Sequence, residues 1–278
     1  MIESTGTVVD SHVHLLPGKL AHKVRAFFHQ HISGDMLAYP LDHALVLEKL
    51  AAAGIGTVWS FPYAHREGVA AGLNAASART VQEQSGGPVE VIGGATVHPR
   101  DEAPAAIVKE AFEEHGLRVL KLHCSVGNFS PDDPALNSVW ELVSLRRVPV
   151  VIHLGHAVSG HTNAAELVPL VNLIERYPEA RIIVAHCGHS AAAKTLDLVQ
   201  HYPHLYADLT PVVFDLVDLP PERAALLSNK LLFGTDAPNA VIPAEKCLEH
   251  LRSLHLPSLA ESAILGGTAR RLIAEVLL

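Results

Sequence analysis

The segment Val8-Val9-Asp10-Ser11-His12-Val13-His14 is the stretch that decides the fold, because an apolar run ends there in a His-x-His pair. Side chains alternate between the two faces of a β-strand, so His12 and His14 point to the same side. Two imidazoles on one face can bind one metal ion. With 19 histidines in 278 residues such a pair can arise by chance, so its meaning depends on the rest of the chain.

Short apolar or β-branched runs recur eight times, and segments with helical spacing separate them. The predicted strands are residues 7–14, 57–61, 89–97, 118–123, 148–154, 181–186, 205–209 and 231–235. Eight parallel strands are the number that closes a barrel. An open doubly wound sheet is the alternative, but no Gly-x-Gly-x-x-Gly follows the first run. The sequence therefore predicts the α/β class and a (β/α)8 TIM barrel.

The segments between the runs carry the start signals of helices. Asp133 is placed to cap a helix that has Pro134 at its first position. Asn163 and Glu166 form a cap with a carboxylate at the third helical position. Helices that alternate with nearly continuous apolar strands indicate a parallel sheet that is covered on its outer face.

Composition narrows the class of protein. Hydrophobic residues make up 49% of the chain and no linker of different composition interrupts it, so we expect residues 1–278 to form a single domain. A net charge of −8 argues against nucleic acid or an anionic membrane as a partner. We see no membrane span and no secretory signal. The three cysteines include no Cys-x-x-Cys pair, so we expect reduced thiols and a cytoplasmic protein.

Polar residues stand at the ends of the predicted strands, where a barrel of this kind carries its active site. They are His12, His14, Lys121, His123, His153, His186 and Asp236. Each alone could be a helix cap or a satisfied core residue. Burying all of them together is costly unless a metal ion and water satisfy them. Alternation also predicts that Lys121 faces inward, while Cys124 and Cys187 face the helices as unreactive thiols.

These residues resemble the amidohydrolase superfamily, in its amidohydrolase-related branch. The matching segments are Val-Asp-Ser-His-Val-His at 9–14, Leu-Lys-Leu-His at 120–123, Val-Val-Ile-His-Leu-Gly at 150–155, Val-Ala-His-Cys-Gly at 184–188 and Phe-Gly-Thr-Asp-Ala-Pro at 233–238. The resemblance implies a divalent metal, usually zinc, on His12, His14, His153 and Asp236. It also implies that His186 binds a second metal or polarises the substrate. Lys121 stands where some members carry a carboxylated lysine that bridges two metals.

The expected cofactor is one tightly held Zn²⁺, with a second ion possible and Mn²⁺ or another divalent metal as the alternative. Zinc supplies hydroxide from bound water at neutral pH. Asp236 would take the proton and return it to the leaving group, and His186 would donate to the oxygen that gains charge. With one metal, Lys121 could instead bind a substrate carboxylate.

The loops that follow the strands should determine the substrate specificity. Residues 17–40 are expected to form a lid, and the second His-x-His, His29 and His31, is assigned to the lid surface because helical spacing separates i and i+2. The candidate substrate-binding residues are Tyr63, Arg66, Arg100, His123 and His156. His123, His156 and His189 could also orient the metal ligands. Donors of this kind favour a small substrate that carries a carboxylate.

Three functions remain open. The first is a metal-dependent hydrolase of a small amide, lactone or ester. The second is a metal-dependent, non-oxidative decarboxylase of an aromatic or enol acid; a low aromatic content of 5%, with Trp59, Phe61 and Tyr63 as the main rings, favours hydrolysis over it. The third is a non-catalytic metal-binding barrel. Relatives often form homodimers, so a homodimer is possible.

Overall fold

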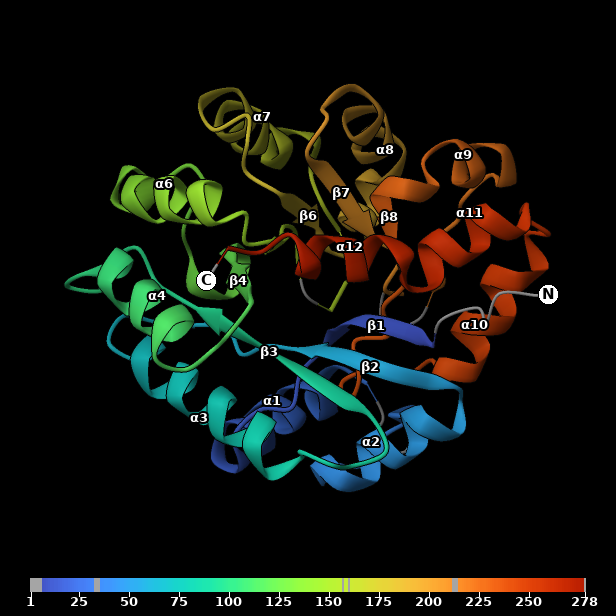
Figure 1. Ribbon diagram of the computed structural model, residues 1–278, viewed down its shortest axis with the longest axis horizontal. Coiled ribbons are helices and arrows are strands. Elements are labelled where there is room, and N and C mark those ends of the chain that lie inside the picture. Colours follow the sequence, from blue (N-terminus) through green and yellow to red (C-terminus); the bar gives the residue numbers. More distant parts are fainter. Residues whose placement is uncertain (1–6, 33–35, 157, 160, 212–214, 278) are drawn as a thin grey trace.

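Eight parallel strands form one sheet in which each strand pairs with the next along the chain (Figure 1). The computed structural model describes residues 7–32, 36–156, 158–159, 161–211 and 215–277. The strands are β1 (Val8–Val13), β2 (Ile55–Ser60), β3 (Glu90–Thr96), β4 (Val119–His123), β5 (Val150–His153), β6 (Ile182–Val184), β7 (Leu205–Asp208) and β8 (Leu231–Leu232).

The sheet closes on itself between its first strand and the segment after its last. The Ser11 amide donates to the Phe233 carbonyl at 2.9 Å, and the Asp236 amide donates to the His12 carbonyl at 2.9 Å. A parallel bridge joins Val13 to Ala237. The prediction of a (β/α)8 barrel is therefore confirmed, and the open doubly wound sheet is excluded.

Helices surround the barrel (Figure 1). They are α1 (Gly18–His31), α2 (His43–Ala52), α3 (Ala70–Glu83), α4 (Pro104–Glu113), α5 (Cys124–Gly127), α6 (Asn137–Arg146), α7 (Leu167–Arg176), α8 (Ala192–His201), α9 (Pro221–Leu226), α10 (Ala244–Ser253), α11 (Ser258–Ser262) and α12 (Thr268–Ala274). Asp133 caps the turn before α6, and Asn163 with Glu166 forms a capping box before α7, as predicted. No helix in the described part of the chain is long and apolar enough to span a membrane.

Strand alternation divides the buried side chains between two cores. Leu120 and Leu122 of β4 pack in the core between strands and helices, whereas Val119 packs inside the barrel. Lys121 is also fully buried. Cys124 and Cys187 lie in the outer core, as predicted, and burial raises the pKa of both thiols, that of Cys187 to about 12.

Two strands, β6 and β8, end two or more residues earlier than predicted, and this changes how the site is built. β6 ends at Val184, because His186, Cys187 and His189 adopt left-handed backbone angles with φ of 55°, 51° and 52°. Left-handed backbone cannot continue a parallel ladder. β8 ends at Leu232, three residues before the predicted end. The residues after both strands therefore belong to tight loops rather than to the sheet.

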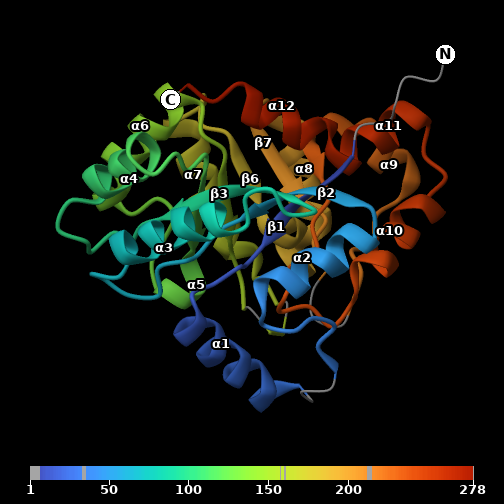
Figure 2. The same cartoon turned by 60° about the horizontal axis from the view of Figure 1, so that its bottom comes forward.

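Helix α1 stands apart from the ring of outer helices, beyond the end of β1 (Figure 2). It lies within the predicted lid, residues 17–40, of which residues 33–35 fall outside the described part of the chain. Its apolar side packs against loop residues such as Val158 and Val241 in one cluster and Tyr63 in another. Helix α1 is thus held by loops that follow several different strands.

Candidate active site

The His-x-His pair of β1 is fixed by hydrogen bonds from one nitrogen of each ring. His12 Nδ1 donates to Asp208 Oδ2 at 2.9 Å, and His14 Nδ1 donates to the Phe61 carbonyl at 2.8 Å. With Nδ1 carrying the proton in each neutral ring, Nε2 keeps its lone pair. The ring centroids are 5.1 Å apart. The two lone pairs are therefore held on one side of the strand, although its pairing with β2 is irregular between Asp10 and Val13.

Both Nε2 atoms face the carboxylate of Asp236. Oδ1 of Asp236 lies 3.2 Å from Nε2 of His14 and 3.8 Å from Nε2 of His12. A carboxylate oxygen and two imidazole lone pairs are all acceptors, so their convergence favours a cation among them, and Lys121 Nζ approaches the His12 lone pair at 3.1 Å. These three side chains form one candidate metal group.

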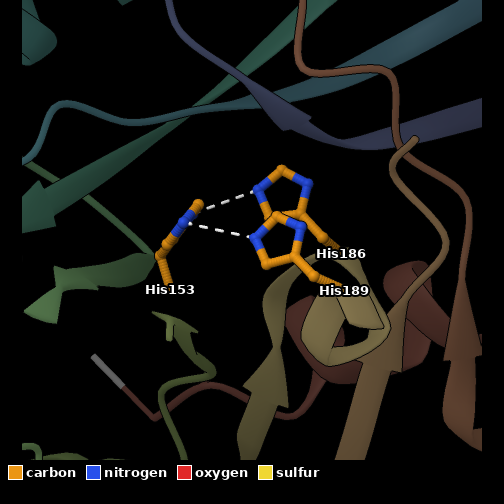
Figure 3. Close-up of side chains that lie close together, drawn as sticks. All are labelled: His153, His186 and His189. Atoms are coloured by element: carbon orange, nitrogen blue, oxygen red, sulfur yellow. Dashed lines mark hydrogen bonds between the residues drawn. The ribbon is translucent and has the colours of Figure 1, made fainter. Parts of the chain in front are cut away.

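His153, His186 and His189 form a second candidate metal group (Figure 3). His153 Nδ1 lies 3.1 Å from His186 Nε2, and His153 Nε2 lies 3.3 Å from His189 Nε2. The rings of His186 and His189 stack at 4.4 Å. The Nδ1 atoms of His186 and His189 are buried without a partner among the described residues. The centroids of His12 and His186 are 4.8 Å apart, so the two groups adjoin.

The structure thus places the four metal ligands that the resemblance implies in two different groups. His12, His14 and Asp236 are brought together, whereas His153 lies with His186 and His189. Imidazole nitrogens and a carboxylate oxygen are donors that zinc and other divalent metals accept. The convergence of the His186 and His189 Nε2 atoms on His153, and the facing acceptors of the first group, show that the residues present fit such an ion.

Lys121 lies at the floor of the centre. Its Nζ is 3.1 Å from His12 Nε2 and 5.0 Å from the centroid of the Phe61 ring. Burial lowers the pKa of Lys121 to about 8, although Asp208 and Asp236 act in the opposite direction. The inward orientation predicted from strand alternation is therefore what the structure has.

Burial keeps the imidazoles of the centre neutral. It lowers the pKa of His12, His153 and His186 well below its usual value, and that of His189 to about 4. For Asp236, burial acts to raise the pKa, but the neighbouring His14, His12 and Lys121 outweigh it and lower the pKa. Neutral imidazoles and an ionised carboxylate are the protonation states that bind metal.

Asp208, which the sequence analysis did not single out, organises the centre. It is fully buried at the end of β7 and accepts from both His12 Nδ1 and the main-chain amide of His186, the latter at 2.8 Å. Its signal in the sequence is its place at the end of a predicted strand, on the same face as Tyr206, which packs inside the barrel. Asp10, likewise buried, accepts from the Thr235 hydroxyl at 2.6 Å and joins β1 to the loop before Asp236.

A cavity of about 270 Å³ opens above the two histidine groups. Its lining is largely apolar and brings together side chains from the lid helix, from loops and from the metal groups. The lining residues are His14, Leu20, Lys23, Val24, Phe27, Phe28, Tyr63, His65, His123, Val126, His153, His186, Asp236 and Asn239. Tyr63 and His123, two predicted substrate-binding residues, lie in it, and His123 stacks on His153 with centroids 3.9 Å apart.

The other predicted substrate-binding residues do not line this cavity. Arg66 and His156 are exposed, and Arg100 is exposed with its Nε 3.9 Å from a Glu67 carboxylate oxygen. All three side chains are exposed, so nearness in sequence to a strand end did not bring them to the centre. His29 and His31 are exposed on α1, in agreement with their assignment to the lid surface.

A closed parallel barrel with histidines and an aspartate gathered at the C-terminal ends of its strands is the architecture of a metal-dependent barrel enzyme. The chain belongs to the amidohydrolase family, whose model matches residues 9–274. Members of this family bind divalent metal ions and act on small molecules.

Solved structures share the fold at low sequence identity. An uncharacterised TIM-barrel protein from Bordetella bronchiseptica has a TM-score of 0.75 at 18% identity, covering 96% of this chain and 98% of that chain. A 4-oxalomesaconate hydratase from Rhodopseudomonas palustris has a TM-score of 0.65 at 16% identity, covering 96% of each chain. A 5-carboxyvanillate decarboxylase from Novosphingobium aromaticivorans, with bound manganese, has a TM-score of 0.64 at 11% identity, covering 98% of each chain. No curated protein matches the chain.

Proposed function

We propose that this protein is a metal-dependent hydrolase of a small amide, lactone or ester that carries a carboxylate. The observation that carries the proposal is the pair of adjoining metal groups below an apolar cavity, with facing acceptors in one group and converging ring nitrogens in the other. Two groups leave room for two ions, and paired ions suit hydrolysis because both the attacking and the leaving oxygen can be stabilised.

His12, His14 and Asp236 would hold one divalent ion, and His153, His186 and His189 have the donors for a second. Zn²⁺ is the first candidate because imidazole nitrogen and carboxylate oxygen suit it, and Mn²⁺ is the alternative. When bound, such an ion lowers the pKa of water and polarises a substrate oxygen.

The chain's own residues would move the protons. Asp236, whose lowered pKa keeps it ionised, would accept the proton of the attacking water and return it to the leaving group. His186, held through its main-chain amide by Asp208, would donate to the substrate oxygen that gains negative charge. Helix α1, packed over the cavity, would exclude bulk water from the reaction.

The second candidate is a metal-dependent decarboxylase, and the lining of the cavity favours it. The overall aromatic content is low, but Phe27, Phe28 and Tyr63 all line the cavity, so rings are concentrated where a flat substrate would lie. One structure that shares the fold is that of a decarboxylase. In this reaction Asp236 would first take the proton of a substrate hydroxyl. The bond between the carboxylate and the substrate carbon then breaks, CO₂ leaves, and Asp236 returns that proton to the carbon.

Metal content followed by a substrate panel tests the proposal. We expect one or two zinc or manganese ions per chain in protein purified without chelator, and products that have gained one water. Products that have lost CO₂ would establish the decarboxylase instead. Metal without turnover on a broad panel would favour a non-catalytic barrel, and protein that neither contains nor takes up metal would contradict all three.

The Asp236→Asn variant tests the proton transfer. Loss of the ionised carboxylate removes both the proton acceptor and a metal donor, so we expect turnover to fall by about 10²-fold or more with the barrel still folded. Asp218→Asn, at an exposed carboxylate in a loop away from the cavity, is the matched control and should keep full activity. Full activity in the Asp236 variant, with unchanged circular dichroism, would rule out the role given to this residue.

A further inference from the structure

The lid helix α1 is basic in a chain that is acidic overall. Its residues Gly18–His31 include Lys19, Lys23 and Arg25 but no aspartate or glutamate, whereas the whole chain has a net charge of −8. These three cations have different surroundings. Arg25 donates to the carbonyls of Tyr39 and Pro238, at 3.0 and 3.1 Å. Lys19 and Lys23 are both exposed, but only Lys23 lines the cavity.

His65, which follows β2, lines the same cavity as Lys23. Burial lowers the pKa of His65, and the charges of Arg66, Lys23 and His98 lower it further. Within the described residues, no carboxylate forms an ion pair with Lys23. The carboxylate that lines the cavity, Asp236, is directed at His14. The lid side of the cavity thus presents two donors without an anion.

Between these donors and the metal groups the cavity is apolar. Leu20, Val24, Phe27 and Phe28 come from α1, and Tyr63 packs against α1 and contacts the ring of His123. A ligand that fills this space has an apolar, flat body of the size of one substituted ring or a short branched chain. Its polar reacting group would lie at the histidines and a second polar group at Lys23.

We propose that Lys23, assisted by His65, binds the carboxylate of the substrate at the lid and thereby selects small apolar acids over neutral analogues. This assignment rests on the proposed function in placing the reacting end of the substrate at the histidine centre. Lys23 replaces Arg66 and Arg100, to which the sequence analysis gave this role. A carboxylate fits better than a phosphate, because apart from His123 and the histidines of the metal groups the lining offers one ammonium, Lys23, and one imidazole, His65, and no arginine fork.

Titration calorimetry on the purified protein as isolated tests the assignment, with benzoate, benzamide and phenyl phosphate as probes. A charge-assisted hydrogen bond contributes about 1.5–3 kcal/mol, so Lys23→Met should weaken benzoate binding by about 10- to 100-fold and remove the preference for benzoate over benzamide. Lys19→Met, on the same helix but outside the cavity, should bind benzoate within about twofold of the wild type. If substrates are found, Lys23→Met should raise KM much more than it lowers kcat.

Three results would overturn the assignment. The first is equal binding of benzoate and benzamide by the wild type, and the second is unchanged benzoate binding in Lys23→Met. The third is an equal loss in Lys19→Met, which would mean a general effect of the helix charge. Tighter binding of phenyl phosphate than of benzoate, lost in Lys23→Met, would contradict the choice of carboxylate. If the preference for benzoate over benzamide depends on Lys23 but no substrate is turned over, only the proposed function is refuted. If substrates are turned over but this preference is absent, only this inference is refuted.

Discussion

Asp208 links two histidines that come from different strands of the barrel. One of its oxygens accepts from the ring of His12 on β1, and the other accepts from the main-chain amide of His186 after β6. The first bond fixes which nitrogen of His12 carries the proton, and it also makes the ring a better metal ligand. Asp208 is therefore a positioning residue that acts through other side chains.

The variant Asp208→Ala should lose metal affinity. Without the carboxylate, His12 can turn or change its tautomer, and residues that orient ligands in this way typically contribute 10- to 100-fold in metal affinity. We expect a loss of about that size in a zinc titration with a competing chelator. Asp208→Asn keeps one acceptor oxygen and should lose less. Metal affinity equal to that of the wild type in Asp208→Ala would show that the bond to His12 does not order the centre.

Asp208 also shows a limit of predicting site residues from the sequence alone. Asp208 ends a strand that the sequence predicted, yet a lone aspartate there is also typical of a helix cap. His12, by contrast, belongs to a recognisable pair. Spacing identifies ligands that are close together in the chain, whereas a partner 196 residues away is identified only by contact.

At the scale of the elements, the position of α1 depends on a few contacts. Arg25 joins the helix to Pro238, two residues after Asp236, and to Tyr39. Phe28 and Val24 pack against loop residues of the barrel. The lid and the loop that carries the candidate base are therefore coupled through one guanidinium.

The variant Arg25→Leu should loosen the lid without unfolding the barrel. Two hydrogen bonds from a charged group are lost, each worth about 1.5–3 kcal/mol when made. We expect amide hydrogen exchange over Gly18–His31 to rise by at least about tenfold, while exchange in β4 and β5 stays unchanged. Lys19→Leu is the matched control, because this side chain is exposed. Unchanged exchange in α1 after the Arg25 substitution would mean that apolar packing alone holds the lid.

At the scale of the whole molecule, the barrel buries polar groups that favour a cation. The acceptors of His14 and Asp236 lie 3.2 Å apart, and buried imidazoles surround them. An ion that binds the folded chain and not the unfolded chain stabilises the fold by mass action, by about 4 kcal/mol at a thousandfold excess over its Kd.

Removal of the metal should therefore lower the melting temperature. For a chain of this size a change of 1 kcal/mol shifts Tm by about 2–4 °C, so we expect Tm to fall by roughly 10 °C after chelation and to recover when Zn²⁺ is added. A His12→Ala, His14→Ala double variant should show little response to either treatment. No change in Tm in wild-type protein whose metal loss has been verified would argue against a site that is coupled to folding.

The sequence by itself determined the fold and the positions of the polar residues. Eight apolar runs with helical segments between them predict a barrel, and the alternation of side chains along each strand places Lys121 inside and Cys124 outside. These features depend on the spacing of apolar and polar residues, which can be recognised within each segment by itself. The family resemblance has the same basis, because its motifs are short and contiguous, and the family match over residues 9–274 confirms it.

Only the tertiary structure decided how the donors are grouped and which cation faces the cavity. The separation of His153 from His12 and His14, the role of Asp208 and the exposure of Arg66 and Arg100 all depend on distances between segments far apart in the chain. Loop conformation sets these distances, and loops lack the periodicity that makes strands and helices predictable. The single domain, the homodimer and the cytoplasmic location stay predictions.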